Sequence, residues 1–118
     1  MDNEEVAEKF VKDTEDVIII VEGKNDKKAL ETIGVSEGNI ITISGRPLEK
    51  VSDETEKRCK SEGKELMILT DFDRKGKTLA AKLTRLLQAR NIHPNQRLRR
   101  MFTRFKKHEV EGVKSETI

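Results

Sequence analysis

Two short apolar runs, each followed at once by acidic residues, place the strongest constraint on the fold of this chain. Val17–Val21 leads directly into Glu22, and Leu66–Thr70 leads into Asp71 and Asp73. Unbroken apolar runs of this length are typical of strands that are buried on both faces, as in a parallel sheet covered by helices. The functional crevice of such a sheet lies beyond the carboxyl ends of its strands. If the two strands are neighbours, three carboxylates meet at one edge, which predicts a site for a divalent cation.

The remaining pattern alternates between helix and strand, which predicts a three-layer α/β sandwich with right-handed crossovers. Apolar spacing and turn residues predict helices at 3–12, 26–33, 47–61 and 75–89, and strands at 17–21, 40–43, 66–70 and 96–98. The first and third strands must be adjacent if their acidic residues are to meet. We therefore expect a parallel four-stranded sheet of strand order about 2-1-3-4.

The composition is that of one small domain with a very polar surface. The chain has 118 residues, of which 34% are hydrophobic and 39% are charged, so a single compact core is expected. No apolar run approaches the roughly 18–20 residues that span a bilayer, and the acidic start does not resemble a secretion signal. The single cysteine, Cys59, excludes an internal disulfide and a multi-cysteine zinc site. We expect a cytoplasmic protein that does not associate with a membrane.

The formal net charge of +2 conceals two oppositely charged segments. Residues 74–108 contain twelve Lys or Arg and no Asp or Glu, whereas residues 1–73 contain eleven basic and nineteen acidic residues. A solvated helical face explains many short charge runs. A basic segment of this length also attracts polyanions, and it predicts nucleic acid, either RNA or DNA, as the partner.

Three familiar motifs do not fit the second acidic run. Gly76-Lys77-Thr78 resembles the end of a Walker phosphate loop, but the first glycine of that loop would fall on Asp71, whose charge repels phosphate. A calcium-binding loop would require carboxylates in place of Lys75 and Lys82. An aspartyl nucleophile of the haloacid-dehalogenase type needs further acids from later strands, and residues 74–108 contain none.

The two acidic runs together resemble the toprim domain, a Rossmann-like fold shared by topoisomerases and bacterial-type primases. Its first motif is an apolar strand that ends in Glu-Gly with an Asp three residues after the glycine, as in residues 17–26. Its second motif is an apolar strand that ends in Asp-x-Asp with a glycine soon after, as in residues 66–76. The segment VEGKNDKKALETIG also looks primase-like. On this basis we expect an N-terminal helix within residues 1–14 packed on the domain, a toprim domain at 15–108 and a C-terminal tail at 109–118.

The resemblance implies that Glu22, Asp71 and Asp73 are both catalytic and metal-binding. In the family, the Asp-x-Asp pair binds Mg²⁺, and the glutamate acts as a general acid or base or helps to hold the metal. Oxygen ligands suit Mg²⁺ or Mn²⁺ rather than zinc. Asp26 is a possible additional acid, although a helix cap explains it equally well. A plainer interpretation of the whole cluster is that the two aspartates cap helices and that the glutamate is only solvated.

Basic residues near the predicted active edge suit a ligand rich in phosphate. The candidates for binding phosphate or nucleic acid are Lys24, Arg46, Lys75, Lys77, Arg99 and Arg100. Such contacts are made mainly to the nucleic-acid backbone and depend strongly on salt. The chain has no Trp or Tyr, so base stacking could use only Phe72, Phe102 or Phe105, which core packing explains equally well.

These residues predict a Mg²⁺-dependent protein that cleaves phosphodiesters or transfers phosphoryl groups on nucleic acid, most simply a small nuclease. The absence of tyrosine excludes the phosphotyrosine link of a topoisomerase within this chain. The small stand-alone toprim proteins remain, among them a nuclease that matures ribosomal RNA. The alternative is a non-catalytic nucleic-acid-binding toprim module that works with protein partners in a larger processing assembly. A small-molecule phosphotransferase is a third class, but the basic segment exceeds what a nucleotide needs.

Overall fold

Three parallel strands form the sheet on which the rest of the chain is arranged. The structure is a computed structural model that describes residues 3–70, 74–100 and 102. The strands β1 (Val17–Val21), β2 (Ile40–Thr42) and β3 (Glu65–Leu69) lie in the order β2-β1-β3. Val17 of β1 pairs with Glu65 of β3 at one end, and Val21 pairs with Leu69 at the other. The predicted adjacency of the first and third strands is therefore confirmed, with both carboxyl ends level at one edge.

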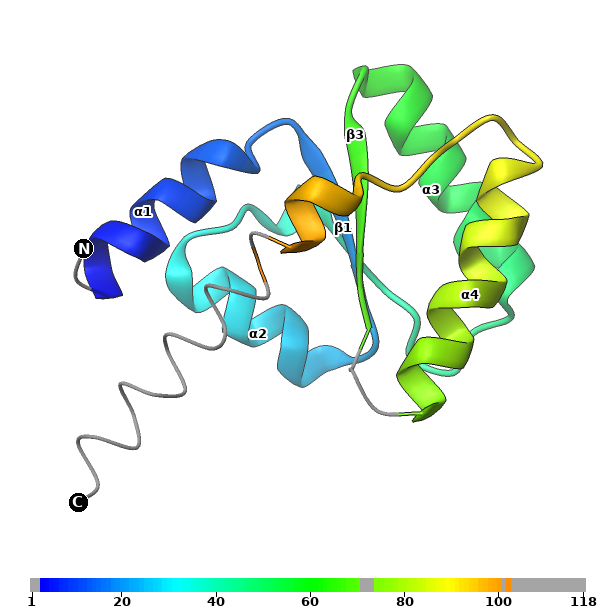
Figure 1. Ribbon diagram of the computed structural model, residues 1–118, viewed down its shortest axis with the longest axis horizontal. Helices are drawn as coiled ribbons and strands as arrows, with labels where there is room; N and C mark the ends of the chain where they lie inside the picture. The colour runs from blue at the N-terminus through cyan, green and yellow to red at the C-terminus, as the bar shows by residue number, and fades with distance from the viewer. Residues whose placement is uncertain (1–2, 71–73, 101, 103–118) are drawn as a thin grey trace.

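Helices cover both faces of this sheet and give the predicted three-layer α/β arrangement. On one face lie α1 (Asn3–Asp13) and α2 (Lys24–Ile33). A short helical segment at residues 96–100 packs on the same face. On the other face lie α3 (Leu48–Glu62) and α4 (Arg74–Gln88) (Figure 1). A short 3₁₀ turn, Glu37–Asn39, precedes β2. No helix in the described ranges is both long enough and apolar enough to cross a membrane.

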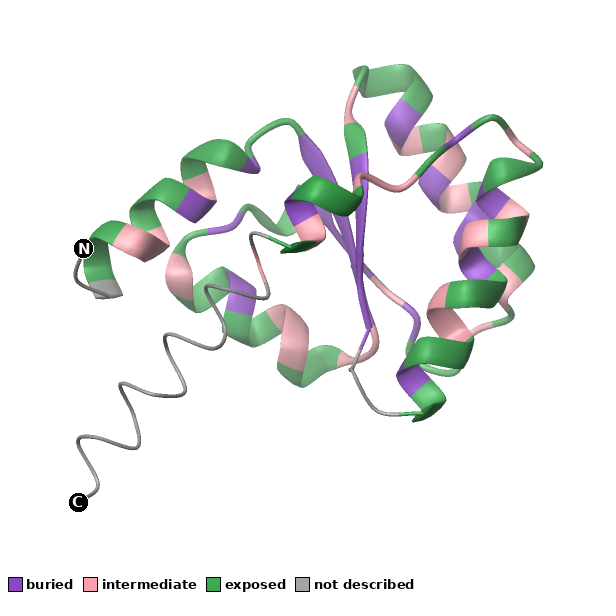
Figure 2. Ribbon diagram, viewed as in Figure 1, coloured by how far each residue is buried: buried purple, intermediate pink, exposed green. Residues whose placement is uncertain are grey.

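The strands are buried on both faces, as their unbroken apolar runs predict (Figure 2). Ile18 and Ile20 of β1 pack into the core beneath α3 and α4. Val17, Ile19 and Val21 pack into the second core beneath α1 and α2. Burial of each such side chain is worth about 1.5–3 kcal/mol. A shift of one residue in register would exchange the two sets, so the two cores together specify where β1 ends and Glu22 begins.

The helix ends follow the glycines of the sequence. Gly34 ends α2 with φ of 113°, and Gly63 ends α3 with φ of 64°. Only glycine adopts these left-handed conformations at little cost. A Cβ on Gly34 would lie 3.4 Å from the side chain of Val11 in α1. That is an ordinary van der Waals separation, so the positive φ, rather than the space beside α1, requires glycine at this position.

The predicted fourth strand at residues 96–98 is wrong, and residues 96–100 are helical. The described sheet has three strands. The backbone N–H of Asn95 donates to Leu66 O at 2.8 Å, so the chain touches the edge of β3 there. The side-chain Oδ1 of Asn95 then accepts the N–H of Leu98 at 3.1 Å, the bond of a helix N-cap. This cap turns the chain into a helix before a strand can form.

Candidate site at the carboxyl edge of the sheet

Glu22 lies directly after β1, at the carboxyl edge where the sequence places it. Its side chain is 25% exposed. The backbone carbonyl of Glu22 accepts the N–H of Ser44 at 2.8 Å, and the carbonyl of Val21 accepts the N–H of Ile43 at 2.9 Å. These two bonds continue the β1–β2 ladder past the last paired residues. The loop after β2 is thereby held against the end of β1, and it brings Ser44 to the same edge.

Asp26 has the role of a helix cap in this structure. Its Oδ2 accepts the backbone N–H of Gly23 at 3.1 Å, which closes the first turn of α2. The helix begins at Lys24, two residues earlier than predicted, because Gly23 serves as the N-cap and Asp26 bonds back to it from the third helical position. A carboxylate there also interacts favourably with the helix dipole. The capping interpretation of Asp26 is therefore supported by a specific contact.

An open hollow of about 630 Å³ lies at this edge and joins three separate segments. The β1–α2 turn contributes Glu22 and Asp26, the segment after β2 contributes Ser44, and the first turn of α4 contributes Lys75. Lys24 also lines it. The Nζ of Lys75 lies 3.9 Å from Oε1 of Glu22. Two carboxylates and two ammonium groups therefore line one open hollow, where a charged ligand would meet both positive and negative side chains.

Asp71 and Asp73 lie outside the described residues, and the chain on either side of them is well placed. Leu69 pairs with Val21, so β3 ends level with β1. Thr70 is buried, and its Oγ1 donates to the carbonyl of Gly76 in α4 at 2.7 Å. The chain thus leaves β3 and enters α4 at the edge that carries Glu22, with Lys75 already beside that carboxylate.

The predicted phosphate-binding residues fall into separate groups. Lys24 and Lys75 line the hollow, and Lys77 is exposed on the first turns of α4. Arg46 does not line the hollow: its guanidinium donates to Glu54 at 2.8 Å and to the carbonyl of Thr42 at 2.5 Å. Phosphate binding by Arg46 stays a prediction, and it would require the guanidinium to bind phosphate in addition to or in place of Glu54.

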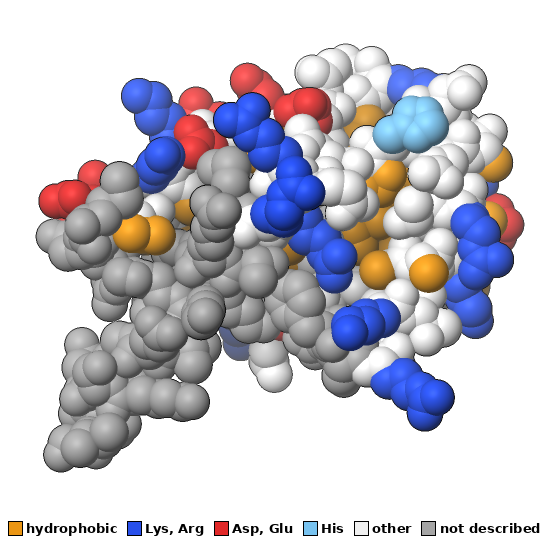
Figure 3. Space-filling model, viewed as in Figure 1, with side chains coloured by type: hydrophobic (Ala, Val, Ile, Leu, Met, Phe, Trp, Pro, Cys, Tyr) orange, Lys and Arg blue, Asp and Glu red, His pale blue; other side chains and the backbone are white. Residues whose placement is uncertain are grey.

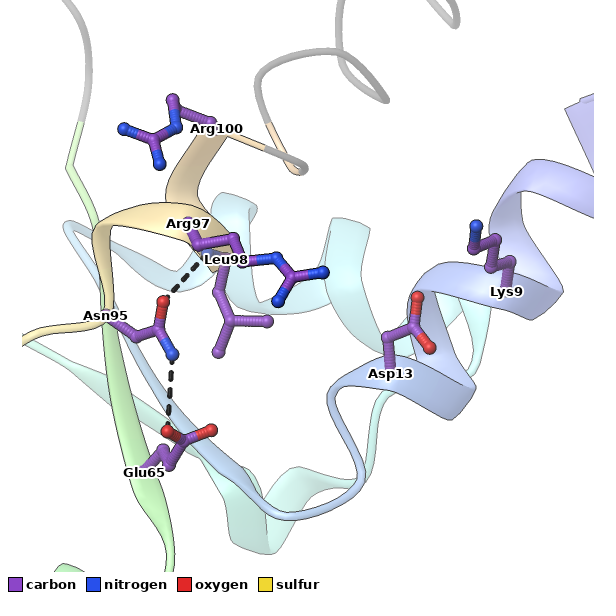
Figure 4. Close-up of a pocket in the computed structure, with 7 residues that line it drawn as sticks. All are labelled: Lys9, Asp13, Glu65, Asn95, Arg97, Leu98 and Arg100. Atoms are coloured by element: carbon purple, nitrogen blue, oxygen red, sulfur yellow. Dashed lines mark hydrogen bonds between the residues drawn. The ribbon is translucent and has the colours of Figure 1, made fainter.

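Arg99 and Arg100 belong to the helix at residues 96–100, where a second hollow of about 790 Å³ opens. It lies between that helix and α1 and reaches the first residue of β3, at the opposite end of that strand from the Glu22 edge (Figure 4). Its lining residues are Lys9, Asp13, Glu65, Asn95, Arg97, Leu98 and Arg100. Sequence reasoning missed Lys9 and Asn95. The Pro94-Asn95 pair could have indicated a helix start, but no local signal predicts that α1 packs beside it.

The described phenylalanines are core residues. Phe10 is 4% exposed, and Phe102 is half-buried against it with ring centroids 5.3 Å apart. Such a tilted pair stabilises the contact between α1 and the segment that contains Phe102. The core interpretation of Phe102 is therefore confirmed. Phe72 and Phe105 lie outside the described residues.

The donors at the carboxyl edge fit a hard divalent cation only in combination with residues 71–73. Within residues 3–70, 74–100 and 102, no three His, Cys, Asp or Glu side chains come together closely enough to hold a metal. Glu22 supplies one carboxylate, and Asp26 already bonds to Gly23. Oxygen donors of this kind suit Mg²⁺ or Mn²⁺. A complete ligand set would require the carboxylates of Asp71 and Asp73.

Residues 17–105 match the Toprim domain family, a match that covers both acidic motifs and the three strands. The chain belongs to the Toprim domain family. It is 39% identical over 95 residues to a UPF0292 protein of Methanocaldococcus jannaschii, a region that is 80% of this chain and 71% of that protein. It is 38% identical over 96 residues to a UPF0292 protein of Thermococcus sibiricus, or 81% of this chain and 71% of the relative.

A solved structure of a protein from Aquifex aeolicus resembles this toprim domain with a TM-score of 0.69 and 27% identity. The likeness covers 86% of this chain and 89% of that one. Membership of the Toprim family implies a metal-binding function connected with nucleic acid, and toprim domains generally bind Mg²⁺ through acidic residues. The UPF0292 name of the relatives states no activity.

Proposed function

We propose that this toprim protein is a small Mg²⁺- or Mn²⁺-dependent nuclease that cleaves phosphodiesters in structured RNA or in DNA. The observation that carries the proposal is the position of Glu22. It lies at the carboxyl edge of β1 beside Lys75, while the bond from Thr70 to Gly76 joins the end of β3 to the start of α4. Both ends of segment 71–73 are therefore close to the same edge, where the Asp-x-Asp motif would complete the site.

Each residue at this edge has a specific task in the proposed reaction. Asp71 and Asp73, with Glu22, would hold the metal, which when bound supplies charge stabilisation to a phosphodiester oxygen. Lys24 and Lys75 line the hollow and would bind the other phosphate oxygens. Alternatively, Asp71 and Asp73 would hold the metal without Glu22, and Glu22 would carry the proton that hydrolysis moves. Asp26 keeps the β1–α2 turn closed through its bond to Gly23 and does not react.

The rival proposal is a toprim module that binds nucleic acid without cleaving it, as part of a larger assembly. One contact favours this rival: the Nζ of Lys75 lies 3.9 Å from Oε1 of Glu22, so an ammonium group already lies beside a carboxylate that the nuclease would use to hold metal. The two proposals predict the same salt-sensitive binding to nucleic acid. They differ in whether a metal ion leads to cleavage.

A cleavage assay separates them. Labelled RNA and DNA are incubated with and without Mg²⁺ or Mn²⁺ in the presence of the wild-type protein, Glu22→Gln or Asp71→Asn. Asp16→Asn is the matched control, because Asp16 is an exposed acid just before β1, at the opposite end of the same strand from Glu22. The nuclease proposal expects metal-dependent cleavage that only Glu22→Gln and Asp71→Asn abolish. Binding without cleavage by the wild-type protein would instead support the module.

A further inference from the structure

A band of exposed basic side chains connects the helix at residues 96–100 with the first turns of α4 (Figure 3). We define this basic band by five exposed residues, which are Arg74, Lys75, Lys77, Arg97 and Arg100. Residues 74–108 contain no Asp or Glu, so no acid from the same segment offsets these charges. Lys75 also lines the Glu22 hollow. The band therefore begins at the candidate site and leads away from it.

The far end of the band is held in place by β3 and limited by α1. The Asn95 N–H bonds to Leu66 O at 2.8 Å, and Leu98 is 9% exposed in the core. Figure 4 shows Arg97 directed toward Asp13 of α1, whereas Arg100 is directed away from α1. The exposed acids of α1 are Glu4, Glu5, Glu8 and Asp13. α1 also exposes Lys9 and Lys12, so it presents a mixed surface with an excess of acids, and Arg97 marks the end of the purely basic band.

The length of the band sets the length of its ligand. The hollow at Glu22 lies at the carboxyl end of β3, and the hollow lined by Arg97 reaches the first residue of that strand. Five residues of strand span about 17 Å at roughly 3.3 Å per residue. A nucleic-acid duplex advances about 3.4 Å per base pair. The two hollows are therefore about one strand length apart, a separation that corresponds to about five base pairs of duplex.

Among the described residues, the side chains that make up the basic band are charged and none is aromatic, which favours a duplex over a single strand. Proteins that bind single strands without sequence preference stack the bases on aromatic rings. The two described phenylalanines are in the core, with Phe10 buried and Phe102 packed against it. Lys and Arg side chains contact the phosphates of the nucleic-acid backbone, and a duplex presents these phosphates as a regular array.

We propose that the basic band binds the phosphate backbone of a double-helical nucleic acid, which lies along β3 from the Glu22 edge to Arg97. This inference rests on the proposed function for its substrate class, but binding through the band does not require the metal. Arg97 and Arg100 together contribute two phosphate contacts. Removing both lowers the slope of log affinity against log salt by about 1.8.

Fluorescence anisotropy in EDTA tests the proposal independently of cleavage. The ligands are labelled RNA and DNA hairpins with stems of about four and about twelve base pairs, chosen to fall short of or exceed the span of the band, and single strands of equal length. The proteins are the wild type, the double variant Arg97→Gln/Arg100→Gln and the control Lys50→Gln/Lys57→Gln. The control removes the same charge from exposed positions of α3, on the other side of the sheet.

The long stem should bind the wild type more tightly than the short stem or the single strand. For the long stem, the ratio of wild-type affinity to double-variant affinity should fall about tenfold between roughly 50 and 200 mM salt. The control variant should bind like the wild type, and the short stem should not distinguish the double variant from either. The proposal would be overturned if the control lost as much affinity as the double variant, if the single strand bound more tightly than the long stem, or if the wild type bound none of the ligands. Binding in EDTA without cleavage in Mg²⁺ would leave it standing and reject only the nuclease.

Discussion

The position of Glu22 depends on neighbours on both sides of β1. The ladder with β2 continues through the bond from Ser44 N–H to the carbonyl of Glu22 at 2.8 Å. On the other side, the register with β3 puts Leu69 opposite Val21. A slip of β1 by one residue would exchange the side chains that face the two cores, and it would draw Asp16 or Glu22 into the paired region. The carboxylate is therefore held by the core of the whole sheet.

Asp26 provides a test of whether a carboxylate at this edge is structural or functional. Asp26→Ala removes the bond to the Gly23 N–H, and loss of such a cap costs about 1 kcal/mol of unfolding free energy. Asp26→Asn keeps an oxygen acceptor and loses only the interaction of the charge with the helix dipole, about 0.3–1 kcal/mol, so it should be less destabilising than Asp26→Ala. Urea denaturation measures both values. Mn²⁺ affinity measured on Asp26→Asn should equal that of the wild type, and a large drop would show that Asp26 is a metal ligand.

Cys59 is a buried thiol whose ionisation opposes folding. Burial raises its pKa above the ordinary value, and the charge of Glu62 raises it further. The folded state thus keeps its proton at a pH where the unfolded state loses it, so its contribution to stability is present at neutral pH and declines above about pH 8.5. Cys59→Ala removes this contribution. Urea denaturation near pH 7.5 and near pH 9.5 should show a larger alkaline loss for the wild type than for the variant, and equal losses would contradict this account.

At the scale of elements, the predicted and observed helices and strands differ most where contacts distant in the sequence decide the outcome. The strands at 17–21 and 66–70 were predictable, because each carries five consecutive apolar or β-branched residues. The strand predicted at residues 96–98 was wrong. The Pro94-Asn95 pair and the four-residue spacing of Leu98 and Phe102 indicate a helix, and the structure adds a contact of Phe102 with Phe10 of α1 that the local pattern does not contain.

Asn95 should be the residue on which the helix at 96–100 depends. Its side chain accepts the Leu98 N–H at 3.1 Å and donates to Glu65 at 3.2 Å. Asn95→Ala loses the cap and should cost about 1 kcal/mol, whereas Asn95→Asp retains an acceptor for Leu98. Gln96→Ala is the control, since Gln96 is exposed beside it. Amide hydrogen exchange should show faster exchange at residues 96–100 in Asn95→Ala only, and unchanged protection would mean that packing alone holds this helix.

At the scale of the whole molecule, the charge asymmetry of the sequence corresponds to a division of the surface. The acid-free segment begins at Arg74, and it supplies the five exposed residues of the basic band from the first turns of α4 and from residues 96–100. At Arg97 the band meets α1, which exposes four acids and two lysines. The sequence predicted a polyanion as partner, but it could not predict the path. The path depends on where α1 packs, and no residue of α1 signals that position.

The position of Glu22 at the carboxyl edge, in contrast, was predictable from the sequence. Two strands that end in acids are enough to bring Glu22 to the edge of a parallel sheet, once strand order is given by their adjacency. The sequence did not predict that Arg46 would pair with Glu54, because a partner eight residues away in the next helix is one of many possible partners. Lys75 was predicted at this edge, and the structure adds its contact with Glu22.

The most direct test of the central claim is Mn²⁺ binding, followed by electron paramagnetic resonance of the free ion. The protein samples are the wild type, Glu22→Gln, Asp71→Asn and Asp73→Asn, with Asp16→Asn as the control at the other end of β1. Loss of one carboxylate from a shared site should lower affinity at least about tenfold, or about 1.4 kcal/mol. The account predicts saturable binding by the wild type and the control, and weakened binding by each of the other three. Wild-type affinity in all three variants, or no binding by the wild type, would contradict it.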